Sequence, residues 1–360
     1  MFFCTCDTIF AKSQSICPKC NIKAHNSLII PNFETKIIHL CLKTYVVSTN
    51  IFRLKVCIYS DGISKFKSSK KSIWPIYLVS VDLDFKNRFK LHNIILLGIY
   101  YGDKKPNLQL CLSKIFDQYY HSGDLCISKK QNQYFVDICF VVADKPARAM
   151  LLNMQSFNSK FFCPICLCCT KTIFDGKKRK IFVPLKNNLF FCKRNKECTN
   201  AIVFSAISTR QPDYGFKGSC FLLNLNSFNI TDSILIDYMH GICSCVFKNL
   251  INLLFFEKFK TIQPPLKKYL GSFDKVSKSF KPSPLLPRGT PLLANFAHWK
   301  SKDYKNFIFF ALPQIKFDQE YHKCIYDTVM LLRRSIFLLL TNGLDSDRLD
   351  KIHGVILEII

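Results

Sequence analysis

Two aspartates, each placed where an apolar run ends, have the positions best suited to metal chemistry in this 360-residue chain. Asp61 closes the run from Asn50 to Gly62, and Asp144 follows the apolar part of the run from Tyr134 to Arg148. Carboxylate oxygens are the ligands that Mg²⁺ and Mn²⁺ prefer. Two such ions can activate an attacking oxygen and stabilise a leaving oxygen. The pattern predicts a divalent-cation site if the fold brings the two strand ends together.

Each aspartate also has a simpler explanation. Asp61 precedes Gly62, and Asp-Gly is a common turn sequence. Asp144 precedes a segment of helical pattern that opens with Pro146, so it could act as a helix N-cap. Both alternatives stay open, although the placement of both residues at strand ends favours the metal site.

The segments between the two aspartates predict the elements that must position them. In chain order they are strands at Arg53 to Ser60, Trp74 to Leu83 and Asn93 to Tyr101, a helix from Pro106, and a strand at Tyr134 to Ala143. Three successive strands, a helix and a fourth strand form the first half of an RNase H-like sheet, in which the first and fourth strands are neighbours. We therefore expect an α/β fold with a mixed RNase H-like sheet, helical and zinc-binding insertions, and a small N-terminal zinc-ribbon-like module.

The 19 cysteines predict metal ligands or buried thiols, because no secretory signal opens the chain and a disulfide framework is then unfavoured. Cys4, Cys6, Cys17 and Cys20 form two close pairs that could meet at one tetrahedral Zn²⁺. The alternative is free cysteines on a small apolar hairpin.

A second zinc-type pair, Cys163 and Cys166, lies in a Cys- and Lys-rich segment. Asp237 and His240 are one turn apart on a helix predicted from Ser233 to Phe256. An accessory zinc site shared by these four residues is conceivable, and a buried core histidine is the alternative. Two further thiols, Cys168 and Cys169, obscure which cysteines would bind.

The formal charge of +26, from 51 basic and 25 acidic residues, favours a polyanionic partner, with nucleic acid first and anionic membrane second. A compositional drift toward Lys, Asn, Ile and Phe is the alternative. A predicted hairpin could contact backbone phosphates through Lys65, Lys67, Lys70 and Lys71, or could be a solvated turn. No apolar stretch reaches the roughly 18 residues of a membrane span. The expected partner is DNA, and no membrane partner is expected.

Composition and pattern divide the chain into five predicted parts. They are a cysteine-rich zinc module (1–30), a linker with a short helical pattern (31–50), the first half of the core (51–160), a Cys/Lys-rich insertion (161–230) and a helical region (231–360). In the last part, Thr261 to Pro291 reads as a tether, and Ala297 to Leu312 and Gln319 to Leu340 read as helices. We expect the core to be incomplete at the C-terminus.

Several long motifs resemble the CACTA-type (En/Spm-like) DDE transposases and the related transposase domain-containing proteins. The motifs, in family order, are Tyr59 to Val79, Asn93 to Leu112, Ala143 to Cys166, Ile236 to Ile242 and His298 to Pro313, besides the N-terminal cysteine cluster. Together they span nearly the whole chain, and none is a generic glycine pattern.

The resemblance implies an RNase H-like transposase core in which Asp61 and Asp144 match the first two acidic residues of the catalytic set. Cys163, Cys166, Asp237 and His240 match the accessory CxxC and DxxH motifs of the family. The third acidic residue is expected downstream in a Phe-Glu block that this chain lacks, so the resemblance implies a C-terminally truncated product.

These observations together predict a DNA transposase or a protein derived from one. Asp61 and Asp144 would hold Mg²⁺ or Mn²⁺ for strand cleavage and transfer, Zn²⁺ would be structural, and transposon ends would be the DNA partner. The expected compartment is the nucleus, and the chain could form a homo-oligomer. The alternatives are a catalytically inactive DNA-binding remnant and a zinc-stabilised interaction scaffold.

Overall fold

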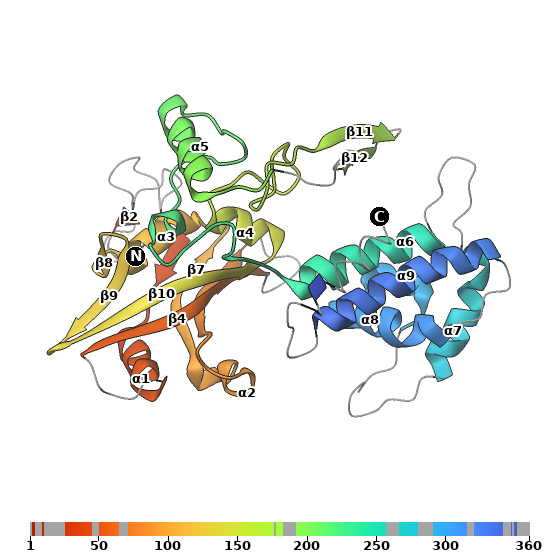
Figure 1. Ribbon diagram of the computed structural model, residues 1–360, viewed down its shortest axis with the longest axis horizontal. Helices are drawn as coiled ribbons and strands as arrows, with labels where there is room; N and C mark the ends of the chain where they lie inside the picture. Colours follow the sequence, from red (N-terminus) through yellow and green to blue (C-terminus); the bar gives the residue numbers. More distant parts are fainter. Residues whose placement is uncertain are drawn as a thin grey trace. The chain divides into compact units, whose positions relative to one another are not determined.

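The computed structural model describes residues 2–3, 9–10, 26–44, 50–64, 71–175, 178–182, 192–256, 266–279, 291–314, 320–340, 347 and 349–350. The chain forms two compact units, Met1–Ile236 and Asp237–Ile360. The first is an α/β unit built on a mixed sheet, and the second contains helices and no strand in its described part (Figure 1).

The first unit is organised around one curled mixed sheet. Its strands run in the spatial order β2-β1-β3-β7-β6-β4-β10-β9-β8, with β13 also paired to β10 and β5 to β6. The outer and shorter strands are β1 (Phe2–Phe3), β2 (Ile9–Phe10), β3 (Asn26–Ile29), β5 (Ile63–Ser64), β8 (Tyr120–His121) and β9 (Asp124–Lys129). The strands nearest the aspartates are β4 (Ile51–Ser60), β6 (Ser72–Ser80), β7 (Ile94–Gly102), β10 (Asn132–Ala143) and β13 (Ile234–Ile236). The four longer strands confirm the predictions made from their apolar and β-branched residues.

Strands β4 and β10 are parallel neighbours at the centre of this sheet. Their pairing runs from Ile51 opposite Gln133 to Tyr59 opposite Val142. Because β6 is antiparallel to β4 and β7 is antiparallel to β6, the first three strands form a meander before the chain crosses to β10. The predicted neighbourhood of the first and fourth strands is therefore confirmed.

A β-bulge interrupts β10 at Cys139. Ile138 lies opposite Val56, but Phe140 lies opposite Cys57, so one extra residue has entered β10. Since alternate residues of a strand face opposite sides, one inserted residue reverses which positions face the core. The buried positions of β10 change accordingly, from even-numbered residues such as Val136 to odd-numbered residues such as Val141.

Strand β10 shares one edge between two partners. Its first residues pair antiparallel with β9 (Asp124–Lys129), and its last three pair parallel with β13. The prediction of a helix across Ser233 to Phe256 is therefore wrong at its start. Ile234 to Ile236 form a strand because their backbone groups complete the free edge of β10, and the helical segment begins only after Asp237.

Three helices cover this sheet and supply its core. Helix α1 (Glu34–Thr44) packs against β4 and β10, and in Figure 1 it is drawn below these strands, with α3 (Leu108–Phe116) and α4 (Lys145–Leu151) above. Ile37 and Leu40 are fully buried, so α1, which lies within the predicted linker 31–50, is part of the packed core. Strand β3 (Asn26–Ile29), which lies within the predicted N-terminal module 1–30, likewise pairs with β7 and joins the sheet.

Helix α4 is shorter than the sequence pattern predicted. It ends at Leu151 instead of near Phe157, because Asn153 turns the chain at a φ of 49° and Met154 then bridges to Phe216. The following Cys/Lys-rich segment contains the hairpin β11 (Lys171–Asp175) and β12 (Lys178–Phe182), then α5 (Lys196–Thr209).

The second unit encloses a separate aromatic core. Its elements are the π-helix η3 (Tyr238–Phe247), α6 (Lys248–Phe255), α7 (Leu270–Ser279), α8 (Ser301–Asn306) and α9 (Glu320–Leu339). Phe255, Phe273 and Phe307 are fully buried against one another. The predicted tether from Thr261 to Pro291 therefore contains a packed helix, α7, anchored by Phe273.

None of the helices that the structure describes is long and apolar enough to cross a membrane.

Candidate functional site

Asp61 follows the last residue of β4, at a two-residue interruption of the pairing with β6. Its side chain is exposed, and it makes no hydrogen bond or ion pair with the part of the chain that the structure describes. Gly62 comes next, and the short strand β5 (Ile63–Ser64) then continues the same antiparallel ladder with β6, with Ile63 opposite Ile73. The turn alternative for Asp61-Gly62 is therefore wrong, because the two residues interrupt the ladder with β6 without reversing the chain. The exposed Asp61 carboxylate is open to a ligand.

The ring of Trp74 packs closely against Gly62. A methyl group on Gly62 would lie 2.5 Å from Cζ2 of the Trp74 ring, so only glycine allows this close approach. The ring is itself 6% exposed, and its Nε1 donates a hydrogen bond to Oγ of Ser72 at 2.9 Å. This packing holds the backbone of Asp61 at the end of β4.

Asp144 follows the last residue of β10 and is the N-cap of α4. Its Oδ1 accepts a hydrogen bond from the backbone N–H of Ala147 at 2.7 Å. The N-cap reading is therefore confirmed. The cap engages one carboxylate oxygen in this hydrogen bond and fixes the side chain beside the strand end.

Asp61 and Asp144 lie opposite each other in the register of the parallel strands β4 and β10. The last paired residues are Tyr59 of β4 and Val142 of β10, and each aspartate lies two residues further along its chain. Adjacent strands are about 4.8 Å apart, so the two residues occupy neighbouring positions. The bulge at Cys139 produces this alignment, because the register before the bulge would place Asp144 opposite Gly62.

The structure also describes part of the predicted phosphate-binding hairpin. Lys65, Lys67 and Lys70 lie outside the described residues, and Lys71 is exposed with its Nζ 5.2 Å from the centre of the Tyr101 ring. The N-terminal ligands predicted for Zn²⁺ also lie outside the described residues; they are Cys4, Cys6, Cys17 and Cys20. The zinc-ribbon-like module therefore stays a prediction.

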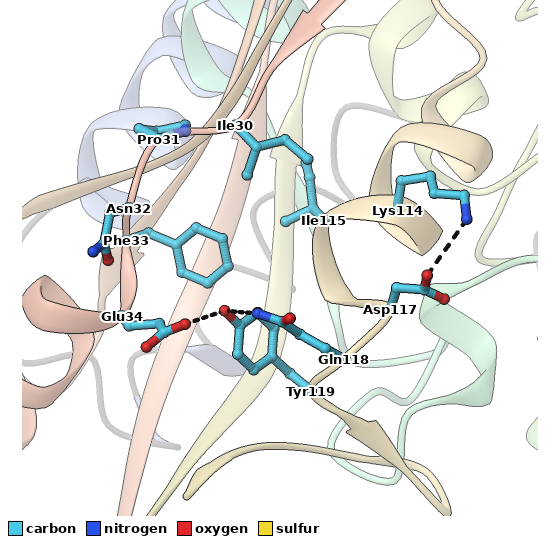
Figure 2. Close-up of a pocket in the computed structure, with 10 residues that line it drawn as sticks. All are labelled: Ile30, Pro31, Asn32, Phe33, Glu34, Lys114, Ile115, Asp117, Gln118 and Tyr119. Atoms are coloured by element: carbon cyan, nitrogen blue, oxygen red, sulfur yellow. Dashed lines mark hydrogen bonds and ion pairs between the residues drawn. The ribbon is translucent and has the colours of Figure 1, made fainter. Parts of the chain in front are cut away.

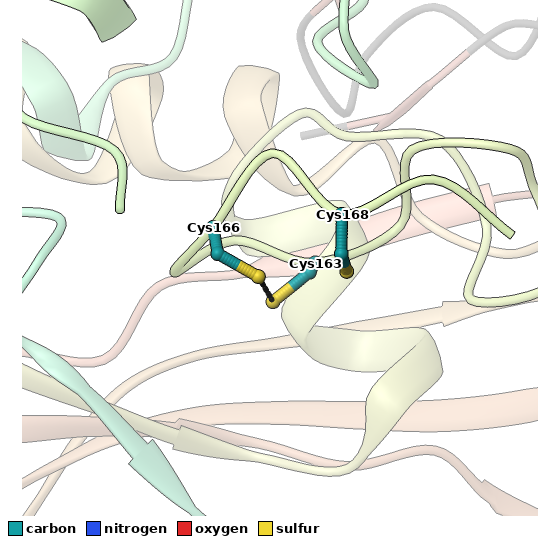
Figure 3. Close-up of side chains that lie close together, drawn as sticks. All are labelled: Cys163, Cys166 and Cys168. Carbon is teal, nitrogen blue, oxygen red and sulfur yellow. Dashed lines mark hydrogen bonds between the residues drawn. The ribbon is translucent and has the colours of Figure 1, made fainter. Parts of the chain in front are cut away.

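A second cluster of metal-binding side chains lies in the loop after α4. The thiol sulfurs of Cys163, Cys166 and Cys168 all lie within 4.8 Å of one another and could hold a metal ion (Figure 3). Burial raises the pKa of the Cys166 and Cys168 thiols, because it disfavours the charged thiolate. The sequence pointed to Cys163 and Cys166 through the CxxC spacing, whereas nothing in it separated Cys168 from Cys169.

Asp237 and His240 lie together at the start of the helical unit. Asp237 caps η3, with its Oδ1 accepting from the backbone N–H groups of Met239 at 2.8 Å and His240 at 3.2 Å. Its Oδ2 lies 2.5 Å from Nδ1 of His240. The pair faces one side of a helical turn, as predicted. A zinc site that these two residues share with Cys163 and Cys166 remains a prediction.

A cavity of about 470 Å³ opens between the β3–α1 connection and the C-terminal end of α3 (Figure 2). Tyr119 donates a hydrogen bond to Glu34 and accepts one from Gln118. Burial, followed by the neighbouring Glu34, raises the pKa of the Tyr119 hydroxyl. Neither strand-end aspartate and none of the clustered cysteines lines this cavity, so it is separate from both candidate metal sites.

Residues 19–187 match the model of a protein family described as a protein of unknown function, DUF1258. The match contains both strand-end aspartates and the three clustered cysteines. No curated protein matches the chain.

Proposed function

We propose that the chain is a DDE-type transposase, or a protein derived from one, in which Asp61 and Asp144 hold a divalent cation at the end of an RNase H-like sheet. The observation that carries this proposal is the level position of the two aspartates on paired parallel strands. The strand order β7-β6-β4-β10-β13, with β4, β10 and β13 parallel, is the order expected for such a core.

The chemistry of the two carboxylates fits Mg²⁺ or Mn²⁺ better than a softer cation, because both donors are hard oxygen ligands. Such an ion, when bound, would lower the pKa of a coordinated water and neutralise charge on a phosphodiester. Asp61 offers an exposed carboxylate, and Asp144 offers a carboxylate whose orientation the α4 cap restricts. The protein would thus hold DNA phosphate and nucleophile at one end of the sheet.

The charge of the chain supports DNA as the partner. A formal charge of +26 would attract the phosphate backbone, and counterion release would make the affinity fall steeply with added salt. A nuclear location follows from the same proposal.

Titration with Mn²⁺ by calorimetry on zinc-loaded protein tests the site. Asp61→Asn and Asp144→Asn should each weaken Mn²⁺ binding by more than the roughly 10- to 100-fold lost with an outer-shell partner. Asparagine at position 144 keeps the N-cap, so the loss would not reflect helix fraying. Asp84→Asn is the matched control. Asp84 is also an N-cap, of α2 (Phe85–Arg88), but it follows β6, which is antiparallel to β4 and ends at the opposite end of the strands.

The outcomes separate the alternatives. Unchanged Mn²⁺ affinity in both variants would overturn the assignment of the site. Salt-dependent DNA binding without Mn²⁺ binding by the wild type would identify an inactive DNA-binding remnant. Zinc binding without either property would identify an interaction scaffold.

A further inference from the structure

The three-cysteine cluster is held between two chain segments that are far apart in sequence. The backbone N–H of Leu167 donates to the carbonyl of Cys192 at 2.9 Å, and the N–H of Arg194 donates to the carbonyl of Ile165 at 2.9 Å. Cys166 and Lys193 form an isolated antiparallel bridge between the same segments. The loop that carries the thiols is thus paired with the residues just before α5.

Arg194 is the unusual member of this arrangement. It is fully buried, and its Nε donates to the carbonyl of Cys163 at 3.0 Å while Nη2 donates to the carbonyl of Tyr214 at 2.7 Å. Its third nitrogen, Nη1, is buried with no hydrogen-bond partner. The guanidinium therefore lies against the cysteine loop with one donor unsatisfied.

A buried cation without a counter-ion is costly, since both its charge and its hydrogen-bond donors lose water. Arg194 forms no ion pair with a carboxylate in the described part of the chain. The ionisable groups whose charged forms would stabilise this guanidinium are Cys163, Cys166, Cys168 and Cys198. A negative charge on the cysteine cluster would remove this cost.

The spacing of the sulfurs suits one tetrahedral ion. With zinc–sulfur bonds of about 2.3 Å, tetrahedral geometry places pairs of sulfurs roughly 3.8 Å apart. The sulfurs of Cys163 and Cys166 are 3.4 Å apart, and all three lie within 4.8 Å of one another. Small side-chain rotations would bring the three into place.

We infer that Cys163, Cys166 and Cys168 are three ligands of one thiophilic cation of the Zn²⁺ type, and that Arg194 is the positioning residue that balances its charge. Each thiol loses its proton to solvent on binding. Three thiolates and a divalent cation leave one net negative charge, which one guanidinium neutralises. The site is independent of Asp61 and Asp144, and it would stand even if the strand-end site failed.

Metal content and cobalt spectra of the full chain test the ligands. Because the N-terminal cysteines could bind their own ion, the readout is the difference from wild type. Cys163→Ser and Cys168→Ser should each lose one equivalent of bound metal and part of the thiolate-to-cobalt charge-transfer absorption. Cys169→Ser, which removes the adjacent thiol outside the cluster, should lose neither.

Two arginine variants test the positioning role. Arg194→Met removes the charge but keeps an apolar chain of similar length, and should weaken Zn²⁺ affinity by about 10- to 100-fold, as loss of an outer-shell partner does. Arg194→Lys keeps the charge and should recover part of that affinity. Equal Zn²⁺ affinity in the wild type and Arg194→Met would overturn the role of Arg194.

Alkylation of the wild-type chain keeps the inference testable if the variants fail to fold. Iodoacetamide labelling read by mass spectrometry should show Cys163, Cys166 and Cys168 protected when Zn²⁺ is bound and labelled after a chelator. Cys192, which is exposed, should be labelled in both states. Equal labelling of the three cysteines with and without the chelator would overturn the site.

Discussion

Asp61 and Asp144 lie level with each other, each two residues beyond the last pair, Tyr59 and Val142, of two parallel strands. The alignment depends on one extra residue in β10, because the register on the N-terminal side of the bulge would place Asp144 opposite Gly62. The bulge also reverses the side of the sheet that the later residues of β10 face. The inserted residue therefore determines both which residue Asp144 lies opposite and which side of the sheet Asp144 faces.

Deleting Cys139 should therefore abolish Mn²⁺ binding at the strand ends. The deletion restores an uninterrupted register and moves Asp144 out of line with Asp61. Cys139→Ser is the matched control, since it keeps the bulge and should bind Mn²⁺ like the wild type. Calorimetry gives the affinity, and a cooperative unfolding transition establishes that each variant is folded. A folded deletion variant with wild-type Mn²⁺ affinity would contradict the role of the bulge.

Replacing Asp144 by alanine should lower stability, whereas replacing it by asparagine should not. The Asp144 carboxylate accepts a hydrogen bond from Ala147 at the start of α4, and loss of such a cap costs about 0.5–2 kcal/mol. Asparagine can accept the same bond. Chemical unfolding followed by circular dichroism measures the difference. Equal stability of the two variants would mean that the cap contributes little.

Gly62→Ala should destabilise the first unit. The added methyl group would lie 2.5 Å from the buried Trp74 ring, and overpacking of this kind costs about 1–3 kcal/mol. Trp74→Leu in the same chain should recover part of the loss by removing the clash. Gly271→Ala in α7 is the control, because nothing lies within 4 Å of its added methyl group. Thermal unfolding of the single and double variants gives the comparison.

Stability should fall as the pH rises above about 9, and Cys111 should contribute to the fall. Burial raises the pKa of the Cys111 thiol from 9.0 to about 12. In that window the unfolded chain loses the thiol proton and the folded chain keeps it, so the free energy of unfolding drops by up to roughly 1.4 kcal/mol per pH unit. The contribution of the buried Cys111 thiol to the free energy of unfolding is complete below pH 9 and is lost as the pH approaches 12.

Cys111→Ala should make the unfolding free energy less dependent on pH in this range. Urea unfolding at several alkaline pH values measures the slope. Cys192→Ala, which removes an exposed thiol, should keep the wild-type slope. An unchanged slope in Cys111→Ala would show that this thiol is not buried in the folded protein.

The strand pattern predicted the central part of the fold because β4, β6, β7 and β10 each carry long apolar runs with clear ends. The start of the Ser233 to Phe256 segment was assigned wrongly because Ile234 to Ile236 is too short to show a period. Its strand form comes from pairing with β10, which no local pattern reveals. Likewise, α7 forms within a Lys-, Pro- and Ser-rich stretch because Phe273 is buried by the aromatic core.

The residues of the candidate sites were also only partly predictable from the sequence. Asp61 and Asp144 were recognisable because each follows a strand, but their alignment required the bulge at Cys139, which has no sequence signal. Cys163 and Cys166 were recognisable from their spacing. Arg194 was not, because its neighbours in the sequence are also basic and only the folded chain buries it.

The shared edge of β10 has a consequence for how the first unit assembles. Strand β9 joins β10 through a tight turn, whereas β13 reaches the other half of the same edge only after the whole Cys/Lys-rich segment. Contacts between residues distant in sequence form more slowly than local ones. We therefore expect the edge beside Asp144 to stay uncovered until late in folding, when an unpaired strand is open to association with other chains.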